Sequence, residues 1–214
     1  MNKLFSIMNK NALIGLLVFL GFPFILKLLP LNLVLQELAM WLLLVLIVLW
    51  IYFIEKKTIA SIGWKKLKLK TIFAGIGIGL ILFIIFGISN VVIQAMGLEL
   101  NQGMAKLLAD QPMPFLILIA LRAGIVEEVL FRGYAFERIN DLTKSKFLAG
   151  LIPLIVFTLA HLAWGVGHLL FVFIAGALFT ILYVAKRNLA LVIIAHFTVD
   201  VIALIVLPML LASQ

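Results

Sequence analysis

The sequence contains no cysteine and few charged residues, and each scarcity excludes a class of protein. Without cysteine, the chain can form no disulfide, no thiolate metal site and no cysteine nucleophile. Charged residues make up 12% of the chain, whereas soluble domains carry about 25%. With 65% hydrophobic residues and a mean hydropathy of +1.28, the composition predicts an all-α fold, a polytopic membrane helical bundle.

Seven hydrophobic segments are long enough to be transmembrane helices, since a span needs about 20 apolar residues. The first has no signal-peptide cleavage site after it, so we expect it to stay attached as a membrane helix. We expect one integrated domain, in which residues 1–112 hold the first three spans and residues 113–214 hold the last four. The predicted spans are residues 11–29, 32–54, 71–96, 113–136, 147–164, 167–185 and 189–211.

Lysine and arginine are concentrated on one side of the predicted bundle. They lie before the first span, in segment 55–70, in loop 137–146 and at 186–187, whereas the other side has only Lys27 and Lys106. By the positive-inside rule, the N-terminus is cytoplasmic, and seven crossings place the C-terminus outside. Topology and contact with anionic membrane lipids then explain the net charge of +8, so no nucleic-acid partner is expected. The short, lysine-rich chain suits a bacterial plasma membrane.

The span at 113–136 carries ionisable residues that an apolar helix would not normally hold. Glu128 and Arg132 are four residues apart and share a helix face, so we expect them to form a structural pair. Glu127 points about 100° away. It has no cation at helical spacing, which leaves its carboxylate as the candidate general base or acid. Arg122 either lines the same cavity or extends toward the membrane surface.

Two histidines lie in later spans. His161 follows Phe157 by one helical turn, so the phenyl ring can pack against the imidazole. His196 precedes Asp200 by one turn, and Asp200 could orient His196, or the pair could donate hydrogen bonds to an oxyanion. Counted along the helices, both histidines and Glu127 lie roughly 12–21 Å from the cytoplasmic face. We therefore expect a hydrolytic site within the membrane, near its cytoplasmic side.

These three groups of residues resemble the motifs of the CAAX-protease and bacteriocin-processing family of intramembrane proteases, also called the Abi family. The family pattern is E-E-x-x-x-R, then F-x-x-x-H, then H-x-x-x-N or H-x-x-x-D. The resemblance covers about residues 113–204, nearly half of the chain. The matching blocks, in the same order, are Glu127-Glu128 with Arg132, Phe157 with His161, and His196 with Asp200.

The resemblance implies an α-helical membrane endopeptidase in which Glu127 and His161 activate a water molecule. His196 and Asp200 would support the oxyanion or the cavity. The eukaryotic prenyl-protein branch typically has asparagine at the last position, and an ionised Asp200 cannot donate a hydrogen bond. The partner would be a peptide or membrane-anchored protein, such as a leader peptide, a bacteriocin precursor or a lipidated C-terminal peptide. The residues expected to support the site are Glu128, Arg132 and Phe157.

A zinc-dependent mechanism is the alternative for the same residues. Glu127, His161 and His196 would suffice as zinc ligands. The sequence, however, has no H-E-x-x-H helix. We therefore favour water activated by glutamate, without a cofactor.

Two other functions use the same inventory of residues. The first is a non-proteolytic bacteriocin self-immunity or scaffold protein, which would bind a peptide without cleaving it. The second is a cation-coupled carrier that uses the buried acids. A carrier usually shows repeated halves or helices broken in matching places, and the sequence shows no such symmetry.

Overall fold

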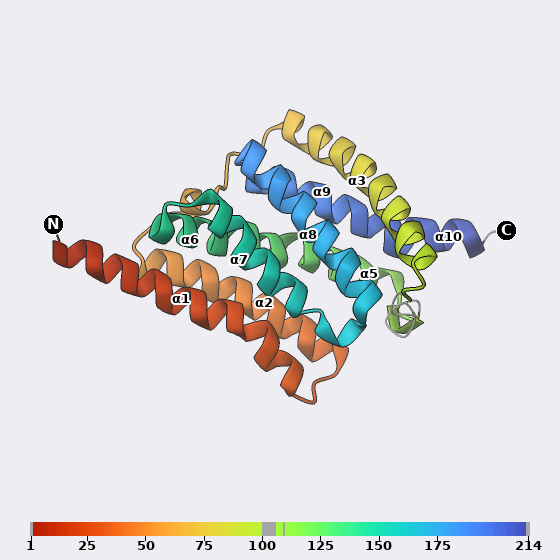
Figure 1. Cartoon of the computed structure of the whole chain (residues 1–214), viewed down its shortest axis with the longest axis horizontal. Helices are drawn as coiled ribbons and strands as arrows, with labels where there is room; N and C mark the ends of the chain where they lie inside the picture. The colour runs from red at the N-terminus through yellow and green to blue at the C-terminus, as the bar shows by residue number, and fades with distance from the viewer. Residues whose placement is uncertain (1, 100–105, 109, 213–214) are drawn as a thin grey trace.

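The computed structural model describes residues 2–99, 106–108 and 110–212, and these residues contain helices and no strand (Figure 1). The chain begins with a hairpin of two long helices, continues through short helical turns and then enters a third long helix. The elements of this half are α1 (Asn2–Leu28), α2 (Leu33–Leu49), η1 (Trp50–Ile54), η2 (Ile59–Ile62) and α3 (Leu69–Ala95).

The second half begins with one continuous helix built from three stretches, of which the middle stretch is a π-helix. Three further helices follow, with a short 3₁₀-helix between the first and the second, and the last helix also contains a π-helical stretch. The elements are α5 (Met113–Arg122), η3 (Ala123–Ala135), α6 (Phe136–Thr143), α7 (Lys146–Leu159), η4 (Leu162–Trp164), α8 (Val166–Lys186), α9 (Leu189–Val201), η5 (Ile202–Val206) and α10 (Leu207–Ala212).

Local sequence signals explain several helix boundaries. The side chains of Asn32, Ser145 and Asn188 each accept a hydrogen bond from the backbone N–H three residues later, which caps the starts of α2, α7 and α9. Lys144 and Arg187 adopt left-handed conformations at the ends of α6 and α8, and such residues commonly terminate helices. Residues next to each turn therefore determine where α6 and α8 end and where α7 and α9 begin.

The structure confirms a polytopic helical membrane protein, and five of the predicted spans appear as long apolar helices. Large apolar side chains such as Leu17, Leu28 and Phe73 are exposed on their outer faces, where a membrane would cover them. The helices in the described part of the chain that are long and apolar enough to cross a membrane are Asn9–Leu28, Leu33–Ile54, Leu69–Ala95, Val166–Lys186 and Leu189–Leu210.

The other two predicted spans differ from the expectation of about seven uniform transmembrane helices. Segment 113–136 is helical, but it changes from α to π geometry at Ala123. Segment 147–164 was predicted as one span, but α7 ends at Leu159 after 14 residues. That length corresponds to about 21 Å, less than the roughly 30 Å of a bilayer core. A turn at residues 160–161 and the 3₁₀-helix η4 then connect α7 to α8.

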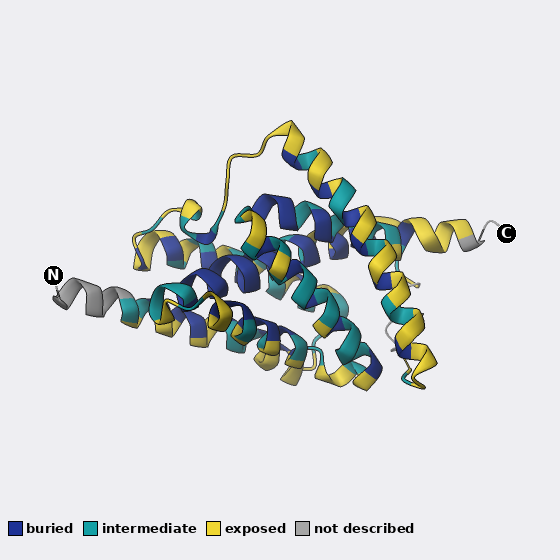
Figure 2. Ribbon diagram, turned by 45° about the horizontal axis from the view of Figure 1, so that its top comes forward, coloured by how far each residue is buried: buried dark blue, intermediate teal, exposed yellow. Residues whose placement is uncertain are grey.

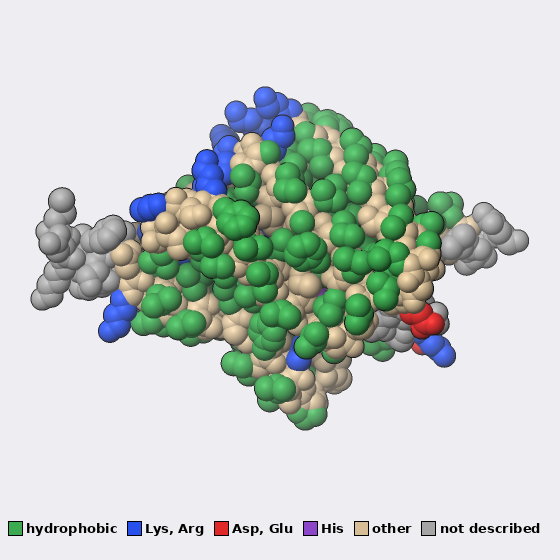
Figure 3. All heavy atoms as spheres, in the orientation of Figure 1, with side chains coloured by type: hydrophobic (Ala, Val, Ile, Leu, Met, Phe, Trp, Pro, Cys, Tyr) green, Lys and Arg blue, Asp and Glu red, His purple; other side chains and the backbone are tan. Residues whose placement is uncertain are grey.

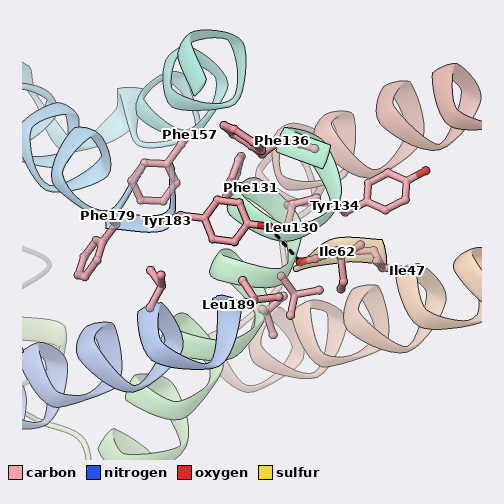
Figure 4. Close-up of a cluster of buried hydrophobic side chains, with 14 of the residues drawn as sticks. Ile47, Ile62, Leu130, Phe131, Tyr134, Phe136, Phe157, Phe179, Tyr183 and Leu189 are labelled. Carbon is pink, nitrogen blue, oxygen red and sulfur yellow. Dashed lines mark hydrogen bonds between the residues drawn. The ribbon is translucent and has the colours of Figure 1, made fainter. Parts of the chain in front are cut away.

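The π-helix η3 lies at the centre of the bundle. It packs against α9, α2, α5 and α7, and only Ile125 and Glu127 among its residues escape full burial (Figure 2). Figure 4 shows the cluster that it forms with residues from other helices, in which Phe131 approaches Phe157 of α7 with ring centroids 5.0 Å apart. The helical stretch that carries Glu127, Glu128 and Arg132 is thus the most enclosed one.

Two glycines allow α3 to approach α9 closely. A Cβ atom at Gly79 would lie 2.7 Å from the backbone oxygen of Ala195, and one at Gly75 would lie 3.2 Å from that of Leu191. Gly77, on another face, has no atom of another segment within 4 Å of its Cβ position. The absence of a side chain at Gly75 and Gly79 therefore permits close packing of these two helices.

Candidate active site

The neighbouring acids of η3 point into different surroundings, as their spacing predicted. Glu128 is fully buried, and its Oε1 accepts hydrogen bonds from Arg132 Nη1 at 2.9 Å and from His196 Nδ1 at 2.8 Å. The predicted pair of Glu128 and Arg132 is confirmed. The sequence did not predict that His196 joins this pair, because His196 lies on α9, 68 residues further along the chain.

Arg132 fixes this buried group to the helices around it. Its Nη2 donates to the backbone oxygen of Gly176 on α8 at 3.0 Å, and its guanidinium lies 4.8 Å from the ring centroid of Phe157. The Phe157 ring in turn packs against His161, with ring centroids 4.9 Å apart. The predicted contact between Phe157 and His161 is therefore confirmed.

Glu127 has a cation partner, contrary to the sequence-based expectation. Arg122 Nη1 donates to Glu127 Oε1 at 2.6 Å. The two residues are five apart, a spacing that puts side chains on different faces of an α-helix. They meet here because the helix changes to i to i+5 hydrogen bonding at Ala123, which brings residues five apart closer to one face.

A third carboxylate, which the sequence analysis missed, holds the other edge of Arg122. Glu37 of α2 accepts from Arg122 Nε at 3.0 Å and from Nη2 at 3.0 Å. The Glu37 side chain is only 6% exposed. It is the only acid within the apolar α2, and an acid in such a helix is itself a signal of function. Arg122 therefore bridges Glu37 and Glu127.

These groups line a cavity of about 140 Å³ between four helical segments. It contains Glu127 and His161 together with Arg122 and Phe157, so the structure brings these four predicted residues to one place. Both Arg122 and Glu127 keep some exposure, 16% and 13% of their side chains. The remaining lining residues are Pro23, Leu26, Lys27, Gln36, Glu37, Met40, Phe131, Ala160 and Trp164.

His161 lies just beyond the end of α7 rather than within a span. Its Nδ1 is 2.8 Å from the backbone oxygen of Phe157. Because a carbonyl oxygen only accepts, Nδ1 carries the proton in this contact, and the other ring nitrogen, Nε2, is left as an acceptor in the neutral ring.

His196 and Asp200 lie behind the cavity. Neither is among the residues that line it. The His196 ring stacks on Phe179 with centroids 4.6 Å apart, and its Nε2 is 3.5 Å from Asp200 Oδ2. Of the two roles considered for Asp200, this arrangement fits orientation of His196 better than contact with a substrate oxygen.

The predicted alternative zinc ligands do not form a metal site. Within the part of the chain that the structure describes, no three His, Asp or Glu side chains converge as a metal ion would require. His196 directs Nδ1 at Glu128 and Nε2 toward Asp200, while Glu127 and His161 face the cavity. These side chains therefore do not fit zinc, and no step of the chemistry below passes through it.

Comparison with known families places this site in a recognised sequence class. Residues 109–202 match the family described as type II CAAX prenyl endopeptidase Rce1-like. No curated protein and no solved structure matches the chain. The matched segment includes all three motif blocks but excludes Glu37. The chain therefore carries an Rce1-like type II CAAX prenyl endopeptidase family domain at residues 109–202, and this family implies a protease.

Proposed function

We propose that the protein is an intramembrane endopeptidase that hydrolyses a peptide bond with water activated by Glu127 and His161. The observation that carries this proposal is their shared cavity, in which both residues are partly open while Glu128 and Arg132 are buried behind it. The cavity of about 140 Å³ is large enough for water and a short stretch of substrate backbone.

The proposed chemistry follows from the free atoms of the two residues. Arg122 holds Glu127 Oε1, and no described residue hydrogen-bonds Oε2. Oε2 can therefore accept a proton from water as the water oxygen attacks the scissile carbonyl carbon. The proton that Oε2 takes from water must then reach the departing amine nitrogen, and the Nε2 atom of His161, left as an acceptor by the Nδ1 contact, can take this proton from Glu127 and pass it on, which restores both residues. The peptide C–N bond then breaks, and the acid and amine products leave.

The remaining motif residues support this pair from behind. We assign Glu128, Arg132 and Phe157 to holding η3, α7 and α8 in register, through the contacts of Arg132 with all three. His196 and Asp200 support the same buried group from α9. Such supporting contacts fix the reacting groups, and a misplacement of about 1 Å can cost about 100-fold in rate.

The membrane setting of this enzyme is part of the proposal. We assign it to a bacterial plasma membrane with the N-terminus cytoplasmic, seven crossings and basic segments against anionic lipid headgroups. Its partner is a peptide or membrane-anchored protein substrate. The halves 1–112 and 113–214 act as one domain, which the contact of Glu37 with Arg122 across that boundary supports.

Cleavage of membrane-anchored peptides by the purified protein in lipid tests the proposal. Wild type, Glu127→Gln and His161→Ala are compared with Asp141→Asn, which removes a carboxylate paired with Lys57, away from the cavity. We expect cleavage by wild type and Asp141→Asn, and loss of cleavage in the other two. Folded wild type that cleaves nothing in a broad library, or a Glu127→Gln variant as active as wild type, would overturn the proposal. A parallel series with a chelator tests the zinc alternative.

A further inference from the structure

A groove between α3 and α9 lies apart from the active-site cavity. It has a volume of about 450 Å³, and no described residue lines both spaces. Both helices belong to the long apolar segments, and the groove residues Leu67 and Ile76 are exposed on the outside of the bundle. The hydroxyl of Thr198 donates to the backbone oxygen of Ile194, so the groove's one polar side chain is already satisfied. The groove therefore offers an apolar surface to the membrane.

The helices that form the groove start at the same end of it. They pack closely at Gly75 and Gly79 of α3 and run in the same direction (Figure 1). The backbone N–H of Leu189, the first residue of α9, donates to the oxygen of Gly63, which lies shortly before α3. This hydrogen bond fastens the segment that leads into α3 to the start of α9.

Lysines surround this end of the groove. Lys68 immediately precedes α3 and lies one helical turn before the groove residue Ile72. The ammonium of Lys65 donates to the backbone oxygen of Lys186 at 3.3 Å, which brings it to the turn between α8 and α9. Figure 3 shows Lys and Arg side chains gathered where α3 begins. The exposed lysines here that form no ion pair with a described residue are Lys65, Lys66, Lys68, Lys70 and Lys186.

We propose that this groove is a binding site for an anionic phospholipid. The headgroup phosphate lies among the unpaired lysines, and an acyl chain lies along the apolar groove between α3 and α9. The lining removes hydrocarbon from contact with other solvent, and the ammonium groups attract a negative headgroup but not a neutral one. This site does not depend on the proposed protease activity, because none of its residues takes part in that chemistry.

A lipid in the groove would touch the helix that supports the active site. Phe197 lines the groove and directly follows His196 in α9. A Cβ atom at Gly124 of η3 would lie 3.2 Å from the Cβ atom of Phe197. The groove is therefore one residue away from the contacts between α9 and η3. Because a ligand that binds only the folded state stabilises it, the phospholipid should raise the unfolding temperature of the bundle.

Lipid binding to the whole protein, purified in detergent and stripped of lipid, tests the proposal. Native mass spectrometry compares phosphatidylglycerol with phosphatidylcholine that carries identical acyl chains. We expect wild type to bind phosphatidylglycerol at least about tenfold more tightly, since each lysine near a headgroup contributes a factor of about five. Equal affinity for the two lipids would overturn the proposal.

Two double variants with the same change in charge locate the headgroup. Lys65→Gln with Lys68→Gln removes two ammonium groups beside the groove, whereas Lys144→Gln with Lys146→Gln removes two exposed ones from the turn between α6 and α7. We expect the first double variant to weaken phosphatidylglycerol binding at least about fivefold and the second less than about twofold. Equal losses in the two would show attraction to the overall charge and would overturn the site.

A second pair of variants tests the acyl-chain position. Ile76→Trp fills the groove, whereas Ile81→Trp adds the same bulk at a position of α3 that does not line it. We expect phosphatidylglycerol to raise the unfolding temperature of wild type and Ile81→Trp, and to bind Ile76→Trp at least about fivefold more weakly. Unfolding without added lipid checks that each variant is folded. Equal binding by the two tryptophan variants would overturn the groove as the site, as would a dimer that covers the groove and persists in phosphatidylglycerol.

Discussion

Glu127 and Glu128 are adjacent in sequence but belong to two different electrostatic environments. Glu127 shares Arg122 with Glu37 at the edge of a cavity, whereas Glu128 is fully enclosed and serves both Arg132 and His196 with one oxygen. The partly open carboxylate keeps an oxygen for water, while the buried one uses its charge to join η3 to α9. The contrast indicates that the cavity group performs chemistry and the buried group maintains structure.

The largest expected effect separates these two environments by activity. Glu127→Gln keeps the size of the side chain but removes the proton acceptor, so we expect peptide cleavage to fall by about 10³-fold to 10⁴-fold. The measurement is kcat/KM on a membrane-anchored peptide, with thermal unfolding in detergent as the check on folding. If the unfolding temperature of Glu127→Gln also fell, and the loss of activity matched the loss of folded protein, Glu127 would be structural like Glu128.

The converse change tests the buried environment by stability. Arg132→Met leaves Glu128 without its strongest partner, and breaking a buried ion pair costs about 3–5 kcal/mol in the free energy of unfolding. Lys57→Met is the matched control, because the pair of Lys57 with Asp141 is 25% and 46% exposed and should contribute less than about 1 kcal/mol. Denaturant unfolding in detergent measures both. Equal losses in the two variants would contradict the distinction drawn between buried and open groups.

Glu37 tests whether the cavity group depends on a carboxylate outside the family segment. In Glu37→Gln, Arg122 loses an anionic partner and can turn toward the second oxygen of Glu127, which the water needs. We expect kcat to fall by about 10-fold to 100-fold with KM little changed, and Glu37→Asp to recover part of the rate.

The neighbouring Gln36→Ala is the control, because Gln36 also lines the cavity but its side chain bonds only the backbone oxygen of Leu31 among the described residues. A rate for Glu37→Gln that equals the rate for Gln36→Ala would show that Glu37 does not position Arg122. A change in KM with kcat unchanged would also contradict a positioning role.

The sequence predicted two contacts between residues four apart, a spacing that brings side chains to one face of an α-helix. Glu128 meets Arg132, and Phe157 meets His161, although η3 is a π-helix and α7 ends at Leu159. The helical membrane architecture was likewise predictable, since long apolar segments can bury their backbone polar groups only as helices in lipid. These features need no knowledge of tertiary contacts.

The remaining features depend on tertiary structure or on irregular backbone. The contact of Arg122 with Glu127 requires the π-helix, which packing around η3 stabilises and which no residue spacing announces. Glu37 reaches Arg122 from 85 residues away in sequence. The end of α7 before His161 was missed because the apolar run continues through Leu162 and Ala163. For Glu37, the only signal in the sequence was a single acidic residue within an apolar helix.

The smallest expected effect concerns the packing that places α9, and with it His196, behind the cavity. Gly79→Ala forces a methyl group to within 2.7 Å of the Ala195 backbone oxygen, one residue before His196. Overpacking of this kind costs about 1–3 kcal/mol in stability. Gly77→Ala meets no neighbouring segment and should raise stability by up to about 1 kcal/mol, because alanine favours the helix. Thermal unfolding of the two variants, two residues apart on one helix, measures the difference. If Gly79→Ala lowers stability while peptide cleavage stays close to wild type, the α9 contacts support the buried group alone; a matching fall in kcat would show that the cavity depends on α9 as well.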